Sequence, residues 1–312
     1  MSKAYLAFDT SNYTTSAAVY VDGVIRQSRM LLPVKKGEAG LRQSDAVFHH
    51  TAQLHKVFNE LDLTGCDIAA VGASFTPRSE QGSYMPCFTV GSSSAKIAAK
   101  LLGVPIYAFS HQQGHIAAAV YSGGNTDLLH QKFIAFHVSG GTTEAVLVSP
   151  DDKNIIATSI IAKTLDLNAG QAVDRTGLML GLDFPCGAEL EKLALACKRD
   201  FNPKPTLKGS NCCLSGLENK CRKMNEQGLS KEETALFCLK YIENTLYAMS
   251  AELIREYGEL PILFAGGVMS NSIIKKGLQA RLNCYFAKPE YSCDNAAGTA
   301  YLTYVSHQAS NC

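Results

Sequence analysis

The sequence lacks several features that would place it in a common class of protein. Its 11 cysteines include no CxxC pair, and the only close ones, Cys212 and Cys213, are adjacent. We therefore expect reduced thiols in a cytosolic protein and no disulfide framework. No apolar run approaches the roughly 18 residues of a membrane-spanning helix, and no basic leader precedes the first predicted strand. The sequence predicts a soluble, cytoplasmic protein with no membrane partner.

Charge of one sign is also scarce. The net charge is +1 and no block of Lys or Arg exceeds a pair, which argues against a nucleic-acid-binding tail or a membrane-surface helix. An RNA partner would therefore be bound by a folded surface or by another subunit. At 312 residues and 46% hydrophobic, the chain is long enough for two domains, each with its own core.

The most informative stretch is residues 133–148, FIAFHVSGGTTEAVLV. Two apolar runs flank Gly140 and Gly141, which permit the positive φ angles of a tight turn, so the pattern predicts a β-hairpin. Backbone N–H groups and hydroxyls crowd this turn, and such a turn could hold a phosphate. A turn that only connects two strands is the other interpretation.

An internal repeat favours the functional interpretation of this hairpin. Residues 5–20, YLAFDTSNYTTSAAVY, align without a gap with residues 133–148 at an offset of 128. The same strand, polar turn and strand thus open each half of the chain. We expect an N-terminal lobe over residues 1–128 and a C-terminal lobe over residues 129–312, with the last helix able to pack back on the first lobe.

A second pair of glycines follows another apolar strand. Residues 261–264 are predicted to form this strand, and Gly266 and Gly267 separate it from a helix that begins at Asn271 or Ser272. Glycines allow close approach, and a helix N-terminus favours an anion, so the junction suits a nucleotide. A simple tight turn between a strand and a helix is the alternative.

Histidines give two candidate metal sites. Three lie within residues 49–55 on a helix predicted over residues 45–61, and we interpret them as solvated or structural because no matching ligand set occurs elsewhere. His111 and His115 are four residues apart, would project from one face of a helix, and could share a metal ion. Asp294 is a candidate third ligand. The sequence has no HExxH motif, which removes the usual local argument for a zinc peptidase.

Six motifs in order carry a resemblance to a known family. They are SHxxGH at 110–115, VSGGTT at 138–143, NAGQAVDRTG at 168–177, LSGL at 214–217, AGGVMSN at 265–271 and CDNAAG at 293–298. In this order they resemble the TsaD family, the tRNA N6-adenosine threonylcarbamoyltransferases that were once described as O-sialoglycoprotein endopeptidases, or glycoproteases. The resemblance covers nearly the whole chain.

The resemblance implies a fold and a set of ligands. The implied fold is α/β, of the two-lobed actin/hexokinase/Hsp70-like (ASKHA) type, with duplicated mixed-sheet lobes flanked by helices. His111, His115 and Asp294 would bind one divalent metal, iron or zinc. The nucleotide, which is ATP, AMP or threonylcarbamoyl-adenylate, would be bound by Val138, Ser139, Gly140, Gly141 and Thr142 on its phosphate side and by Asp174, Gly187 and Asn271 on the rest.

The implied activity is transfer of a threonylcarbamoyl or carbamoyl group from an adenylate to an amine, namely N6 of the adenosine beside the anticodon of tRNA. No catalytic residue is implied apart from the metal site. A metal can act on the carbamoyl end as a Lewis acid while backbone donors bind the leaving phosphate. The implied partners are tRNA, an adenylate-supplying enzyme and TsaB-like or TsaE-like proteins.

The sequence departs from the family pattern around these ligands. The turn after Ser11 lacks the usual Cys and acidic residues, Thr142 replaces a His, and Gln171 replaces a Glu. The segment that normally reads like PGSFTGLRVG is rebuilt around residues 78–88. Because the three metal ligands are kept while their surroundings differ, the pattern indicates a divergent paralogue.

Three alternative functions stay open on the sequence. The first is a carbamoyltransferase that acts on a small molecule or a protein, which the near-neutral charge suits better than tRNA. The second is a non-catalytic scaffold or partner in a TsaD-type complex, although a scaffold would not need three metal ligands. The third is a metallopeptidase, which rests only on the old description of the family.

Overall fold

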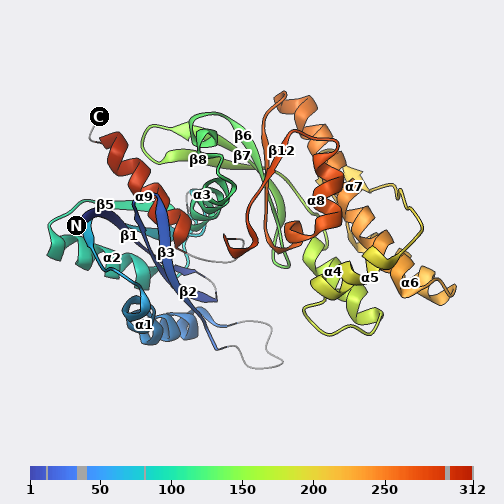
Figure 1. Cartoon of the computed structure of the whole chain (residues 1–312), viewed down its shortest axis with the longest axis horizontal. Helices are drawn as coiled ribbons and strands as arrows, with labels where there is room; N and C mark the ends of the chain where they lie inside the picture. The colour runs from blue at the N-terminus through green and yellow to red at the C-terminus, as the bar shows by residue number, and fades with distance from the viewer. Residues whose placement is uncertain (12, 34–40, 81, 292–295, 311–312) are drawn as a thin grey trace. The chain divides into compact units, whose positions relative to one another are not determined.

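The computed structural model describes residues 1–11, 13–33, 41–80, 82–291 and 296–310 (Figure 1). Packing divides the chain into two compact units. Unit 1 comprises Met1–His130, Ser149–Thr158 and Glu290–Cys312, and unit 2 comprises Gln131–Val148 and Ser159–Pro289. The last helix thus belongs to unit 1. The lobe boundary expected at residue 128 stays a prediction.

Unit 1 is built on a mixed sheet of five strands in the order β3-β2-β1-β4-β5. The first three strands form an antiparallel meander, and β4 and β5 extend the sheet parallel to β1. The strands are β1 (Ser2–Ser11), β2 (Thr14–Val21), β3 (Val24–Leu31), β4 (Cys66–Thr76) and β5 (Ile106–Ser110). The turn between β2 and β3 is tight because Asp22 and Gly23 both adopt positive φ angles, 49° and 79°.

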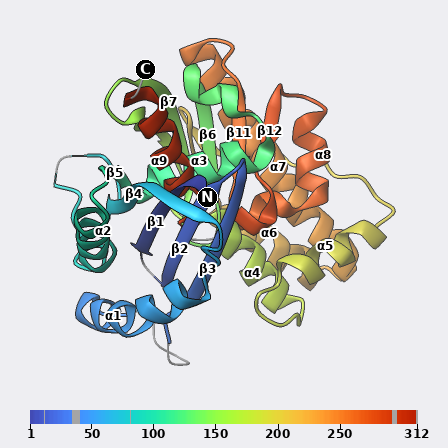
Figure 2. The same ribbon diagram turned by 60° about the vertical axis from the view of Figure 1, so that its left-hand side comes forward.

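Helices cover both faces of this sheet. They are α1 (Gln43–Glu60), α2 (Phe88–Leu102), α3 (His111–Gly123), the 3-10 helix η1 (Thr126–His130) and α9 (Ala297–Ser310). Figures 1 and 2 show α1 and α2 on one side of β1–β3, and α9 with α3 on the other. Side chains alternate along β1, so Leu6 and Phe8 pack into the core with α1 and α2, whereas Tyr5 packs on Tyr304 of α9 with ring centroids 5.2 Å apart.

A second mixed sheet of five strands, most of it in unit 2, has the order β12-β11-β6-β7-β8. Here β7 is antiparallel to β6, while β11 is parallel to both β6 and β12. The strands are β6 (Phe133–Val138), β7 (Thr143–Asp151), β8 (Ile155–Lys163), β11 (Ile262–Ala265) and β12 (Cys284–Phe286), and β9 (Leu207–Lys208) and β10 (Asn211–Cys212) form a separate small ribbon. Stacked rings of Phe136, Phe264 and Phe286 join three neighbouring strands of the sheet.

The remaining helices of unit 2 surround α7, which is 27 residues long. Helix α7 spans Lys231–Tyr257, and the helices around it are α4 (Ala169–Met179), α5 (Gly187–Ala196), α6 (Ser215–Glu226) and α8 (Ser272–Gln279), with the 3-10 helix η2 (Gly267–Ser270). The 3-10 helix η3 (Pro289–Tyr291) lies where the chain passes from unit 2 to unit 1. Residues of α4, α5, α6 and α8 share one hydrophobic core with α7, in which Tyr241 and Leu246 are fully buried.

The sequence repeat corresponds to a structural repeat with the same register. In the first hairpin Phe8 pairs with Ala17 and Thr10 with Thr15. In the second hairpin the residues 128 positions later form the corresponding pairs, such as Val138 with Thr143. The order β3-β2-β1-β4-β5 of the first sheet also matches β8-β7-β6-β11-β12 of the second. The predicted pair of hairpins and the duplicated mixed sheets are therefore confirmed.

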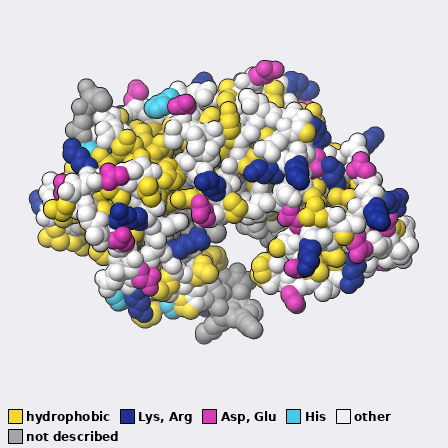
Figure 3. Space-filling view, in the orientation of Figure 1, with side chains coloured by type: hydrophobic (Ala, Val, Ile, Leu, Met, Phe, Trp, Pro, Cys, Tyr) yellow, Lys and Arg dark blue, Asp and Glu magenta, His cyan; other side chains and the backbone are white. Residues whose placement is uncertain are grey.

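The nine described cysteines are all free thiols, as expected. Within the described part of the chain, no helix is both long and apolar enough to cross a membrane. Basic and acidic side chains are interspersed over the face shown in Figure 3, consistent with the scarcity of charge runs in the sequence. The helix predicted over residues 45–61 is α1, which begins slightly earlier, at Gln43.

Candidate nucleotide and metal sites

The glycine turn between β6 and β7 is closed by the side chain and backbone of one serine. Ser139 N donates to Thr142 O at 2.7 Å, and Ser139 Oγ accepts hydrogen bonds from Gly141 N at 3.3 Å and Thr142 N at 3.1 Å. The N–H groups of Gly141 and Thr142, which the sequence suggested as phosphate donors, are therefore bonded to the Ser139 hydroxyl. Gly140, at the tip, is the residue of this turn that lines a cavity.

Helix α4 begins directly against the same hairpin. Gly170 N donates to Ser139 O at 3.0 Å and Ala169 N donates to Thr143 Oγ1 at 2.9 Å. A Cβ atom at Gly170 would lie 2.5 Å from Gly140 N, which is closer than real Cβ contacts, so the close approach requires glycine. Gln171 Oε1 accepts from Asn168 N at 3.3 Å and helps to cap the helix.

The junction between β11 and α8 lies beside the end of β6. Gly266 has a φ of 102°, which disfavours any residue with a side chain, and a Cβ atom there would also lie only 2.3 Å from Val138 O. Both the backbone conformation and the lack of space therefore require glycine. Asn271 caps α8, with its Oδ1 accepting from Ile273 N and Ile274 N, both at 3.1 Å. The remaining hydrogen-bonding group of that side chain is its NH2 donor.

Asp174 and Gly187 are brought together by the connection between α4 and α5. Asp174 Oδ1 accepts from Cys186 N at 3.0 Å, which positions the residue just before Gly187 and the start of α5. Burial first, and the Asp174 carboxylate second, raise the pKa of the Cys186 thiol. Cys186 therefore stays a neutral thiol.

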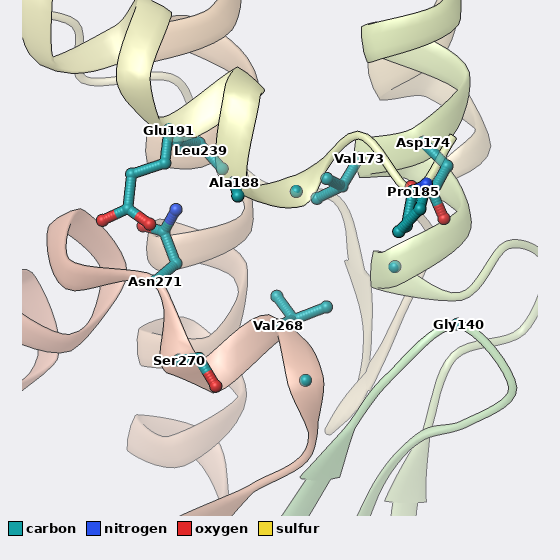
Figure 4. Close-up of a pocket in the computed structure, with 13 residues that line it drawn as sticks. Gly140, Val173, Asp174, Pro185, Ala188, Glu191, Leu239, Val268, Ser270 and Asn271 are labelled. Carbon is teal, nitrogen blue, oxygen red and sulfur yellow. The ribbon is translucent and has the colours of Figure 1, made fainter. Parts of the chain in front are cut away.

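These elements enclose a cavity of about 400 Å³ in unit 2. Gly140, Asp174, Gly187 and Asn271 all line it; three of them come from separate motifs, and Gly187 lies outside the motifs at the start of α5. Apolar walls are contributed by residues such as Val173 and Val268 (Figure 4). Apolar walls with a few polar groups, in a volume of this size, are typical of a small-molecule site.

Glu191 is a further lining residue that the sequence did not single out. In Figure 4 its carboxylate, on α5, lies opposite the side chain of Asn271. Glu191 Oε1 accepts from Ser272 N at 2.7 Å and from Ser272 Oγ at 2.5 Å. These bonds fix the carboxylate at the cavity wall, where its other oxygen can accept a hydrogen bond from a ligand hydroxyl. A single Glu within a helical pattern gave no signal in the sequence.

The two histidines of the HxxxH motif adjoin each other at the start of α3 in unit 1. Ser110 caps this helix, because its Oγ accepts from Gln113 N at 3.2 Å while Gln113 Oε1 accepts from Ser110 N at 2.7 Å. The next turn of the helix brings the Nε2 atoms of His111 and His115 to 2.9 Å from each other. Both imidazoles thus present the same nitrogen to one point.

A buried carboxylate on β1 orients the first of these rings. Asp9 is 1% exposed, and its Oδ2 lies 2.8 Å from His111 Nδ1. Ser74 Oγ also donates to Oδ2, and Ser11 N donates to Oδ1 at 2.9 Å. Burial raises the pKa of Asp9, but the electrostatic interaction with His111 and the hydrogen bonds from His111, Ser11 and Ser74 outweigh it, and the pKa is lowered overall.

The predicted third metal ligand, Asp294, lies outside the described residues. Gly298, four residues later in the sequence, packs tightly on α3, since a Cβ atom there would lie 1.8 Å from Gly114 O. Gly114 itself lies between the two histidines in the sequence. Among the described residues, no group of three His, Cys, Asp or Glu side chains is arranged to hold a metal ion.

The histidines of α1 form no such pair. His50 is fully buried, and its Nδ1 lies 2.8 Å from Thr15 Oγ1. Burial lowers the pKa of His50 to about 4 despite the nearby negative charge of Asp9, so the ring is neutral at physiological pH. The solvated or structural role expected for these histidines stays a prediction; His55 is exposed on the same helix.

The predicted site residues therefore fall into two groups. Four of the eight predicted nucleotide-binding residues line one cavity in unit 2, while Val138, Ser139, Gly141 and Thr142 form the hairpin behind it. His111 and His115 form a pair in unit 1. The sequence did not identify Asp9, which directly follows the apolar residues 4–8 of β1, as the partner of His111.

Solved structures define the class to which this fold belongs. Full-length HypF in a phosphate- and nucleotide-bound form aligns with a TM-score of 0.59 at 13% identity, over 97% of this chain and 46% of that chain. A ROK family glucokinase from Streptomyces griseus, in complex with glucose and AMPPNP, aligns with a TM-score of 0.54 at 11% identity, over 98% and 99%. The chain spans about half the length of HypF. The predicted ASKHA-type fold is confirmed.

The sequence comparisons identify the family. The family model of TsaD, tRNA N6-adenosine threonylcarbamoyltransferase, matches residues 42–301. The enzyme of that name from Thermosipho africanus is 29% identical over 96% of this chain and 93% of its own length, and one from Streptococcus pneumoniae is 29% identical over 96% and 90%. This chain belongs to the TsaD family, which is a family of acyltransferases that act on tRNA.

Proposed function

We propose that this chain transfers a threonylcarbamoyl group from threonylcarbamoyl-adenylate to N6 of the adenosine beside the anticodon of tRNA, with the help of one divalent metal ion. In this reaction the N6 amine forms a new C–N bond to the carbamoyl carbon and loses a proton. The bond from that carbon to the phosphate oxygen breaks, and AMP leaves with the electron pair. Membership of the TsaD family supports transfer to tRNA. The adenylate donor and the metal ion are proposed from the cavity in unit 2 and from the histidine pair in unit 1.

The observation that carries the adenylate donor is the cavity in unit 2. Its volume of about 400 Å³ suits a nucleoside monophosphate. Val173 and Val268 would pack on the base, and the carboxylates of Asp174 and Glu191 would accept hydrogen bonds from the ribose hydroxyls. Gly140, at the tip of the hairpin, would adjoin the phosphate, where backbone donors stabilise the negative charge of the leaving AMP.

The residues of the HxxxH motif fit a metal ion. His111 and His115 direct their Nε2 atoms toward one point, 2.9 Å apart, and the Nδ1 atom of His111 is already bound to Asp9. Two imidazoles and a carboxylate from Asp294 would form a donor set that suits zinc or ferrous iron. Such an ion would supply Lewis-acid polarisation of the carbamoyl carbonyl.

Elemental analysis tests the metal part of the proposal. We expect about one equivalent of iron or zinc in the purified wild-type protein and at least a tenfold loss in His111→Ala, because two ligands seldom retain a metal that requires three. His55→Ala is the matched control, since His55 is exposed on α1. A metal-free, well-folded wild type, or an equal loss in both variants, would contradict the assignment.

Titration with AMP tests the nucleotide part. Asp174→Ala should weaken AMP binding by at least tenfold, because it removes a hydrogen-bond acceptor from the cavity wall. Asp183→Ala should leave the affinity unchanged, since Asp183 is exposed and does not line the cavity. Equal affinities of wild type and Asp174→Ala would place the nucleotide elsewhere. In that case carbamoyl transfer from another donor, or a scaffold role, would be the better interpretation.

A further inference from the structure

We propose that Asp9 is a positioning residue for the histidine pair: its carboxylate fixes His111 in the Nδ1–H tautomer, so that the Nε2 lone pair is directed toward His115. This inference rests on the proposed metal site. It assigns a role to a residue of the first hairpin that the motifs did not identify as part of a site.

The tautomer follows from the hydrogen bonds around Asp9. An ionised carboxylate can only accept hydrogen bonds, so the contact of 2.8 Å between Asp9 Oδ2 and His111 Nδ1 requires the proton to be on Nδ1. The neutral ring then has its lone pair on Nε2, which lies 2.9 Å from His115 Nε2. A metal ion binds the nitrogen that carries the lone pair, and a carboxylate on the other nitrogen is a common way to select it.

Each oxygen of Asp9 has its own donors, which fixes the direction of the carboxylate. Ser11 N binds Oδ1 at 2.9 Å, whereas His111 and Ser74 both bind Oδ2. Ser74 Oγ lies in turn 3.4 Å from Thr299 Oγ1 on α9. The network therefore joins β1, β4, α3 and α9. The ring of His111 is held at its Nδ1 atom by a side chain that cannot rotate without breaking its bonds to Ser11 on β1 and Ser74 on β4.

The substitution Asp9→Asn tests the tautomer most sharply. Ser11 N would keep the amide oxygen at the position of Oδ1, so the NH2 group would face His111. That group can only donate, and His111 Nδ1 would have to accept, which moves the ring proton to Nε2. Removal of the lone pair from Nε2 should weaken Zn²⁺ binding by about 10- to 100-fold, the usual range for such outer partners.

Two measurements on the full chain check this prediction. Long-range proton–nitrogen NMR spectra of the metal-free protein report the tautomer of His111, which we expect to be Nδ1–H in wild type and Nε2–H in Asp9→Asn. Competition of Zn²⁺ with a chromogenic chelator reports affinity. Asp67→Asn, an exposed carboxylate on the neighbouring strand β4, should change neither. Ser74→Ala, which removes one donor but keeps the carboxylate, should keep the Nδ1–H tautomer.

The outcomes separate this inference from the proposed function. An Nε2–H tautomer in wild type, or an unchanged tautomer and Zn²⁺ affinity in a folded Asp9→Asn variant, would overturn the positioning role. If Asp9→Asn does not fold, the tautomer in wild type and Ser74→Ala decides the question. Failure of wild type to bind any metal would refute the metal site, yet the tautomer would still show whether Asp9 orients His111.

Discussion

The two hairpins of the repeat share a register but use equivalent atoms differently. Ser11 N of the first hairpin donates to the side chain of Asp9, whereas the equivalent Ser139 N of the second donates to Thr142 O and closes the turn. Ser11 Oγ is buried without a hydrogen-bond partner in the described structure, while Ser139 Oγ accepts from two amides. One scaffold thus directs a carboxylate to a histidine pair in unit 1 and presents a glycine turn to a cavity in unit 2.

The two hairpins share their backbone pairing. They differ in the polar groups at the strand ends, and these groups determine what each hairpin binds. Asp9 occupies the position that His137 holds in the second hairpin. A buried carboxylate must be stabilised by several donors, and unit 1 supplies them from three elements, β1, β4 and α3. The second hairpin has no such requirement at this position and is instead held by the N-terminus of α4.

The largest effect is expected where a helix touches the second hairpin. Gly170→Ala would place a Cβ atom 2.5 Å from the backbone nitrogen of Gly140, so the hairpin must shift. We expect AMP binding to weaken by at least tenfold and the protein to lose about 1–3 kcal/mol of stability. Calorimetric titration with AMP and urea unfolding measure the two effects.

The matched change at the first hairpin is Gly91→Ala. There a Cβ atom would lie 3.0 Å from Thr10 Oγ1, which is the end of a side chain and not backbone. We expect a loss of less than about 1 kcal/mol and unchanged AMP binding. Similar AMP affinities in both variants would show that the second hairpin does not bound the nucleotide site.

A pH effect should arise from unit 1 through His50. Its pKa is lowered from 6.5 to about 4 by burial, so between these pH values the unfolded chain binds more protons than the folded one. The stability that neutral His50 contributes is therefore complete above pH 6.5 and is lost as the pH falls toward 4. Between pH 7.5 and pH 5 this loss amounts to about 1–2 kcal/mol after allowance for solvent screening.

Urea unfolding of wild type and His50→Asn at several pH values isolates this contribution. The variant cannot be protonated at that position, so its stability should fall less steeply below pH 6.5 than that of wild type. Parallel stability profiles for the two proteins would mean that His50 titrates normally in the folded state.

The smallest effects should distinguish the two equivalent serines. Ser139→Ala removes the acceptor of Gly141 N and Thr142 N, and we expect AMP binding to weaken by about three- to fivefold. Ser11→Ala removes a buried hydroxyl that has no partner in the described structure, so stability should stay constant or rise by about 1 kcal/mol. A reversed pattern in thermal unfolding and AMP titration would show that the hairpins are not specialised in this way.

The sequence predicted the fold well because its signals are local. The glycine pair at Gly140 and Gly141 and the ungapped repeat indicated both hairpins, and their register follows from the offset of 128. The Ser110 cap and the spacing of His111 and His115 placed two imidazoles on one helical face.

Contacts between distant segments could not be predicted in the same way. The bond from Asp9 to His111 joins residues 102 positions apart, and Glu191 reaches the cavity only because α5 packs beside α8. Neither residue has a spacing or neighbour in the sequence that reveals its partner. The sequence also could not show which N–H groups of the glycine turn are available to a ligand. That depends on the rotamer of Ser139, whose hydroxyl accepts hydrogen bonds from Gly141 N and Thr142 N.

The central claim is the transfer of a threonylcarbamoyl group to tRNA. The most direct test incubates stoichiometric wild-type protein with synthetic threonylcarbamoyl-adenylate and unmodified tRNA, and then measures threonylcarbamoyladenosine in the tRNA digest by mass spectrometry. We expect the modified nucleoside with wild type and His55→Ala, and at least a hundredfold less with His111→Ala. Unmodified tRNA from a wild type that binds both metal and AMP, with the carbamoyl group instead on a small amine or a protein, would contradict the account.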